Sequence, residues 1–154
     1  MKSRFLIIFI LFFVNCDKRS SIERIAENYI KTVEKINKKE YSFNVFITEI
    51  KVEDITIYRL NAMSSALIKG EDLPYNFYKY KDHFLFLFNS EKIVDNQEKL
   101  ESLGLFKKQD IFILEHYPEW ILIKCNKTNR KFLFKEGWYR PLNQIQEIQN
   151  FKCY

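Results

Sequence analysis

The feature that most constrains the fold is one amphipathic helical pattern near the start of the chain. Between residues 22 and 36, apolar residues recur at the i, i+3, i+4 and i+7 spacing, and most of the other positions are charged. Ser20 stands three residues before Glu23, which is the spacing of a capping box. The pattern predicts a helix that begins at Ser20, ends at the Asn37-Lys38-Lys39 cluster and buries one face against another layer.

The rest of the chain changes mainly to the period-two alternation of strands. Residues 41–48 and 55–60 predict an antiparallel hairpin around Glu53-Asp54, followed by a loop over 61–73. Residues 75–80 and 84–88 predict a second strand pair around a turn at Lys81-Asp82-His83. Three further strands are predicted at 111–115, 120–125 and 130–134, with turns at Pro118-Glu119 and Asn126–Asn129. Short helices are predicted at 91–103, stopped by Gly104, and after Pro141.

Together these elements predict one α+β domain over residues 20–154. Its N-terminal amphipathic helix would pack on a meandering antiparallel sheet of about six to seven strands. The chain is 47% hydrophobic and 17% aromatic, which is typical of a globular protein and not of a disordered one.

A separate signal precedes the helix. Lys2 and Arg4 are followed by an unbroken apolar run of ten residues, 5–14, and then by Asn15 and Cys16. This run is typical of a secretory signal and falls short of the roughly 20 residues that span a membrane. Residues 13–16, Phe-Val-Asn-Cys, resemble the lipobox of bacterial lipoproteins, with Asn15 in the place of the family's usual small residue.

That resemblance covers residues 1–16 and implies a signal peptide at 1–15, a lipidated Cys16 and a tether at 16–19. The protein would then be anchored by lipid to a membrane of the bacterial cell envelope, facing the periplasm or the cell surface. Four residues reach about 14 Å at most, which would hold the domain against the bilayer. A soluble secreted protein with an incidental Cys16 and an uncleaved signal anchor are the two alternatives.

The charge of the chain argues against a nucleic-acid partner. Loss of Lys2 and Arg4 with the leader lowers the formal charge from +5 to +3. No dense block of lysine and arginine stands in the sequence, as nucleic-acid binding requires.

Two cysteines are left after Cys16 is assigned to lipid. Cys125 and Cys153 can form a disulfide in an oxidising compartment, or they can remain two separate thiols. The sequence leaves this choice open, because a disulfide requires the two Cα atoms to approach within about 7 Å.

Catalytic and cofactor motifs are absent from the sequence. Its three glycines are isolated, so no phosphate-binding loop is predicted, and no metal-ligand spacing occurs. The one candidate general base is His116, near Glu115 and Glu119, although neighbouring strand residues point to opposite faces and leave Glu115 badly placed. We therefore expect no metal, no cofactor and no enzymatic activity, with a hydrolase built on His116 as the weakest alternative.

The candidate binding surface is aromatic. Tyr75, Tyr78 and Tyr80 lie in one predicted strand, whose alternation places Tyr75 with Phe77 on one face and the other two tyrosines on the opposite face. Exposed tyrosines suit protein interfaces or sugar stacking, whereas buried ones would simply fill the core. The same choice applies to two aromatic residues after Gly137, namely Trp138 and Tyr139.

These features predict a small non-catalytic envelope lipoprotein that binds a macromolecular partner near the membrane. An inhibitor or immunity-type role is one version of this function. The alternative is a module that binds a glycan or an amphiphile between the first helix and a concave sheet.

Overall fold

The computed structural model describes residues 20–37, 42–64, 73–89, 97–105, 112–113, 117–136 and 142–153. The elements in chain order are α1 (Ser21–Asn37), β1 (Phe43–Val52), β2 (Ile55–Ser64), β3 (Asn76–Tyr80), β4 (His83–Phe88), α2 (Gln97–Ser102), β5 (Phe112–Ile113), β6 (Glu119–Cys125), β7 (Lys131–Glu136), the 3-10 turn η1 (Leu142–Gln144) and α3 (Gln146–Gln149). The mixed α+β class is confirmed, with more strand than helix. None of the helices in these ranges is long and apolar enough to span a membrane.

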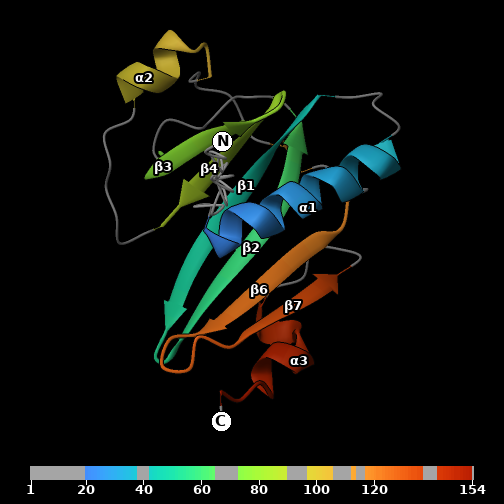
Figure 1. Cartoon of the computed structure of the whole chain (residues 1–154), viewed down its shortest axis with the longest axis vertical. Helices are drawn as coiled ribbons and strands as arrows, with labels where there is room; N and C mark the ends of the chain where they lie inside the picture. The colour runs from blue at the N-terminus through green and yellow to red at the C-terminus, as the bar shows by residue number, and fades with distance from the viewer. Residues whose placement is uncertain are drawn as a thin grey trace, which may run out of the picture.

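The strands form one twisted sheet in the order β3-β4-β1-β2-β6-β7, with β5 also beside β2 (Figure 1). Every described pair is antiparallel apart from β1 and β4, which run parallel with Val45 opposite Leu85. The prediction of an antiparallel sheet is therefore wrong at this pair. Strand β1 lies between β2 and β4 in the sheet. A short turn forces β1 and β2 to run antiparallel, but a long segment of chain separates β1 from β4, so these two strands can run parallel.

Helix α1 covers one face of the sheet, which we call the front face (Figure 1). Its capping box is formed, since the Glu23 N–H donates to the Ser20 hydroxyl at 3.3 Å and the Ser20 N–H donates to the Glu23 carboxylate. The helix buries one stripe completely, and each such aliphatic or aromatic side chain contributes about 1.5–3 kcal/mol. The stripe comprises Ala26, Tyr29, Ile30 and Val33, packed on Phe43, Val45, Ile47, Leu60, Ala62, Leu85 and Trp120.

Tyr29 also bridges a gap in the sheet. On one side of β2, β6 pairs with it as far as Leu60, and β5 pairs with it from Met63. Between these points the Ala62 N–H donates to the Tyr29 hydroxyl at 2.8 Å, and that hydroxyl donates to the Pro118 carbonyl at 2.8 Å. Burial raises the pKa of Tyr29 well above its ordinary value, so the hydroxyl keeps the proton that it donates.

Helix α2 covers part of the opposite face, the back face. Leu100 and Leu105 pack there against Phe46 and Phe86. The Gly104 N–H donates to the Glu101 carbonyl and the Leu105 N–H donates to the Leu100 carbonyl, which is the Schellman pattern. Gly104 has a φ of +67°, a conformation that glycine adopts without strain, and the predicted helix stop at this residue is confirmed.

The C-terminal segment covers another part of the back face. Ile145 is fully buried against Ile57, Ile121 and Ile123, and Ile148 and Phe151 pack around them. Cys153 follows this segment and forms a disulfide with Cys125 at the end of β6, with the two Cα atoms 5.7 Å apart. The disulfide therefore holds the C-terminal segment on the sheet.

Three local predictions are wrong. Strand β2 continues to Ser64, where the sequence predicts a loop, because it has partners on both sides in β1 and β5. His83 belongs to β4, since Lys81, at a φ of +53°, and Asp82 alone make the turn. Glu119 is the first residue of β6 and not a turn residue.

Candidate functional site

The β3 tyrosines are half-buried and pack against the core beneath α1. Tyr78 and Tyr80 lie on the front face, and Tyr75 joins them there, whereas Phe77 packs in the α2 cluster on the back face. The prediction that Tyr75 shares a face with Phe77 is wrong, because Tyr75 precedes β3 and so lies outside its alternation. Each of these tyrosines thus packs partly against the core and leaves part of its side chain exposed to solvent.

The hydroxyls of Tyr75 and Tyr78 differ in their hydrogen bonding. The Tyr75 hydroxyl donates to the Glu49 carboxylate at 2.7 Å, and burial together with this hydrogen bond raises the pKa of Tyr75. The Tyr78 hydroxyl is buried and has no hydrogen-bond partner in the part of the chain that the structure describes. Burial, with the charges of Glu23 and Glu27, raises the pKa of Tyr78 well above its ordinary value, so the hydroxyl stays neutral.

Several predicted site residues lie outside the described residues. These are Cys16, His116, Trp138 and Tyr139. Glu119, the second carboxylate near His116, is described and is fully engaged by Arg59.

Arg59 and Glu119 form a buried bidentate ion pair on the back face. Arg59 Nε lies 2.6 Å from one Glu119 carboxylate oxygen, and a terminal guanidinium nitrogen lies 2.8 Å from the other. The side chains are only 9% and 1% exposed. Each charge offsets the desolvation of the other, so this carboxylate is not free to orient a catalytic histidine.

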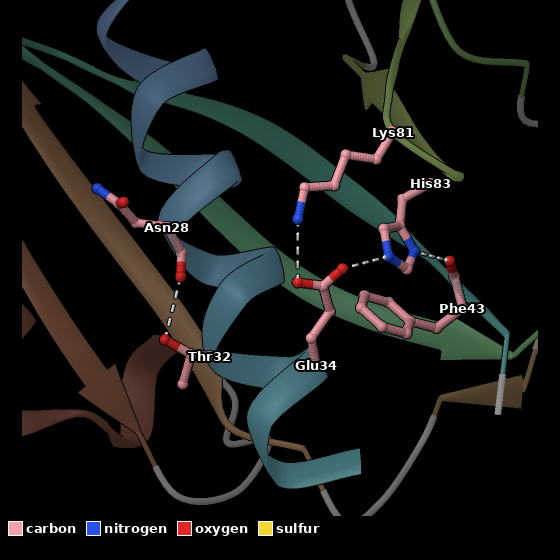
Figure 2. A network of polar contacts seen from close by, with 6 residues as sticks. All are labelled: Asn28, Thr32, Glu34, Phe43, Lys81 and His83. Atoms are coloured by element: carbon pink, nitrogen blue, oxygen red, sulfur yellow. Dashed lines mark hydrogen bonds and ion pairs between the residues drawn. The ribbon is translucent and has the colours of Figure 1, made fainter. Parts of the chain in front are cut away.

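A polar network ties α1 to the β3–β4 turn (Figure 2). His83 Nδ1 lies 2.8 Å from the Phe43 carbonyl oxygen, His83 Nε2 lies 3.2 Å from Glu34 Oε1, and Lys81 Nζ lies 3.5 Å from Glu34 Oε2. Burial alone would raise the pKa of Glu34, but the His83 hydrogen bond and the Lys81 charge outweigh it and hold this pKa below its ordinary value. Both nitrogens of His83 are engaged, so this histidine holds the helix to the hairpin and is not a free general base.

A row of lysines crosses the part of the front face that α1 leaves uncovered. Lys51 on β1 is opposite Thr56 on β2, Thr56 is opposite Lys124 on β6, and Lys124 is opposite Lys131 on β7. We call Lys51, Lys124 and Lys131 the lysine row. It lies close to the β1–β2 and β6–β7 turns, at the end of the sheet that none of the described helices crosses in front (Figure 1).

Two lysines of this row, Lys124 and Lys131, have no compensating carboxylate among the described residues. Lys124 and Lys131 are directly opposite each other, an arrangement that destabilises a strand pair. Neither lysine forms an ion pair with any carboxylate in the described ranges. Asp54 at the adjacent turn pairs instead with Lys127 at 2.7 Å, and Glu49 accepts a tyrosine hydroxyl. Lys124 and Lys131 therefore place two neighbouring positive charges on this face.

Aromatic and apolar groups border the row. Lys135 Nζ lies 4.6 Å from the ring centroid of Trp120, so its charge is held over that indole. Leu133 lies between Lys131 and Lys135 on the same face of β7 and is 39% exposed. Such a surface can bind phosphate or carboxylate groups through charge and take up apolar contact at Leu133.

The sequence alone does not reveal the full lysine row, because Lys51 is far from the other two along the chain. The sequence does, however, allow the pairing of the other two lysines to be predicted. Lys124 and Lys131 are equally distant from the predicted turn over Asn126–Asn129, so a regular hairpin register places them opposite each other.

The described ranges contain no group of three or more histidine, cysteine, aspartate or glutamate side chains that could hold a metal ion. A scan against protein-family models, a search of curated proteins and a search of solved structures found no match to this chain.

Proposed function

We propose that this protein is a non-catalytic cell-envelope lipoprotein, anchored through Cys16, that binds a protein partner beside the membrane. Residues 1–15 act as its signal peptide and residues 16–19 as its tether. An inhibitor or immunity-type role is one form of this function.

The observation that carries the proposal is the start of the folded domain. The hydrogen bonds between Ser20 and Glu23 begin α1 four residues after Cys16. Four residues reach about 14 Å at most, so an acyl chain on Cys16 would keep the sheet next to the bilayer. Two or more acyl chains would make that attachment stable.

The edge strand β3 is the proposed partner surface. It is the outermost strand on its side of the described sheet, and Asn76 and Lys79 on it are exposed. The other edge strand, β7, carries two exposed lysines against one on β3, and edge lysines discourage strand addition. A partner that adds a strand to β3 would also contact the half-buried Tyr78 and Tyr80.

No observation on the described residues specifically supports either alternative function, the glycan- or amphiphile-binding module or the hydrolase. The buried stripe of α1 packs directly on the sheet, with Tyr29, Ile30 and Val33 fully buried, where an amphiphile would have to bind. The hydrolase would need Glu119 near His116, and that carboxylate is committed to Arg59.

Intact mass spectrometry of the membrane fraction tests the anchor. The wild-type chain should begin at Cys16 and carry added acyl mass, whereas Cys16→Ser should keep its leader and lack that mass. An unmodified wild-type chain contradicts the proposal.

A photo-crosslinking residue at Asn76 tests the partner surface. It should capture an envelope protein that the same residue at Lys31, exposed on α1, does not capture. Equal capture at both positions, or none at either, would argue against β3 as the binding edge.

A further inference from the structure

The ring of His83 faces a hydrogen-bond acceptor on each side (Figure 2). The Phe43 carbonyl oxygen lies 2.8 Å from Nδ1, and a Glu34 carboxylate oxygen lies 3.2 Å from Nε2. A carbonyl and an ionised carboxylate accept hydrogen bonds and cannot donate them. Both contacts are therefore hydrogen bonds only when both ring nitrogens carry a proton, which is the charged form of histidine.

We infer that His83 is a pH-sensitive clamp: its charged form ties the last turn of α1 to the β3–β4 hairpin, and loss of one proton releases that turn. Histidine is the side chain that ordinarily changes its charge between pH 5 and 8. The clamp belongs to the folded domain and does not depend on the proposed anchor or on the proposed partner.

Burial decides which of the two hydrogen bonds is lost when the ring becomes neutral. Phe43 is 1% exposed and His83 is 9% exposed, so water cannot readily replace the hydrogen bond from Nδ1 to the Phe43 carbonyl. The Glu34 side chain is 24% exposed and can turn to water instead. The remaining proton therefore stays on Nδ1, and the bare Nε2 then faces the Glu34 carboxylate with lone pairs on both sides.

The other charged and titratable groups around His83 come from the hairpin. Lys81 in the turn lies 3.5 Å from the second Glu34 oxygen, Asp82 directly precedes His83, and Tyr80 is opposite His83 on β3. Strand β1 contributes a backbone carbonyl and a phenyl ring, neither of which is charged. Among the described residues, the contact from α1 to the His83 ring is thus the Glu34 carboxylate.

The charge of Glu34 sets the lower limit of the clamp. Burial alone would raise the pKa of Glu34, but the His83 hydrogen bond and the Lys81 charge hold this pKa below its ordinary value. Glu34 therefore remains charged in moderately acidic solution, where His83 is charged as well. The clamp opens at low pH through Glu34 and at higher pH through His83.

The last turn of α1 depends on this contact more than the rest of the helix does. The buried apolar stripe of α1 ends at Val33, and Ile36 in the last turn is 47% exposed. Within residues 34–37 only Asn37 is buried, and Glu34 supplies the link to the hairpin. Apolar packing holds the earlier turns at any pH, so release is confined to the end of the helix.

NMR of the ring nitrogens tests the charge of His83 in the oxidised full-length chain carrying Cys16→Ser. The chain has two histidines, so His116→Gln assigns the remaining ring signals to His83. At about pH 5.5 both nitrogens of His83 should carry protons, and at about pH 8.5 only Nδ1 should. A ring that is neutral at the lower pH, or that keeps its last proton on Nε2, overturns the inference.

Hydrogen exchange of the same chain measures the release. Rates are corrected for the intrinsic pH dependence of amide exchange and compared as protection factors. Protection over residues 34–37 should fall roughly fivefold between the two pH values, which is the effect of one partly exposed hydrogen bond. Protection over residues 120–125, in β6, should not change.

Glu34→Gln separates the clamp from general effects of pH. By turning its amide, the glutamine can accept a hydrogen bond from a protonated Nε2 or donate one to a bare Nε2, so it suits both forms of the ring. This variant should lose the fivefold change over residues 34–37. Glu98→Gln, the same substitution at an exposed position of α2, should retain it. Equal protection at the two pH values in the parent chain, or a fall that persists in Glu34→Gln, contradicts the clamp.

Discussion

Replacement of Tyr29 by phenylalanine removes one oxygen from the centre of the fold. The aromatic ring keeps its place in the stripe of α1 and its edge-on contact with Trp120, whose ring centroid lies 5.4 Å away. Only the two hydrogen bonds that bridge β2 and the segment before β6 are lost, namely those to the Ala62 N–H and the Pro118 carbonyl.

The cost of this change follows from burial. Ala62 is 2% exposed, so its N–H would lose its acceptor where water has little access, which costs about 1–3 kcal/mol. Pro118 is only half-buried, and water can satisfy its carbonyl in part. We expect Tyr29→Phe to lower the free energy of unfolding by about 2 kcal/mol. With a urea slope of about 1.5 kcal/mol/M, the midpoint would fall by roughly 1.3 M.

Tyr78→Phe is the matched control, because it removes a buried tyrosine hydroxyl that has no hydrogen-bond partner among the described residues. Loss of that hydroxyl should leave stability unchanged or raise it by up to about 1 kcal/mol. Both variants are measured by urea unfolding of the oxidised full-length chain carrying Cys16→Ser, so that no lipid contributes.

The two substitutions are thus expected to differ in their effect on stability although each removes one tyrosine hydroxyl. A Tyr29→Phe midpoint equal to that of the parent chain, or equal to that of Tyr78→Phe, would refute the role of Tyr29 in bridging the sheet.

Three further predictions concern stability. Reduction of the bond between Cys125 and Cys153 should cost about 3–4 kcal/mol in the chain-entropy model, and hydrogen exchange should rise first over residues 142–153; unchanged exchange there would contradict the role of the disulfide in holding this segment. The lowered pKa of Glu34 stabilises the fold above the ordinary value of 4.5, and that contribution is lost as pH falls through the folded-state pKa, so Glu34→Gln should flatten this part of an acid-unfolding curve. An acid-unfolding curve of the same shape as the parent's would argue against it. Arg59→Met should cost about 3–5 kcal/mol because it leaves Glu119 charged and buried, whereas Arg59→Met with Glu119→Leu should recover most of that loss in thermal unfolding; equal losses in the two variants would show that the pair is not coupled.

Local chemistry was readable from the sequence. The hydrogen bonds of the Ser20–Glu23 capping box, the helix stop at Gly104 and the turn between β1 and β2 each depend on a few neighbouring residues. A wrong local prediction, the loop after Leu60, arose where strand partners outside that segment decided the outcome. The candidate site divides in the same way, since a hairpin register relates Lys124 to Lys131 but nothing local relates either to Lys51.

The sequence by itself determined the mixed α+β class and most of the strand pairs joined by short turns, because spacing, capping and turn residues act over a few positions. Only the tertiary structure decided the parallel pairing of β1 with β4, the bridging hydroxyl of Tyr29 and the alignment of three lysines across four strands. Each of these joins residues that are distant along the chain. Their proximity follows from the order and register of the strands, which are set by the packing of the whole sheet against α1, α2 and the C-terminal segment.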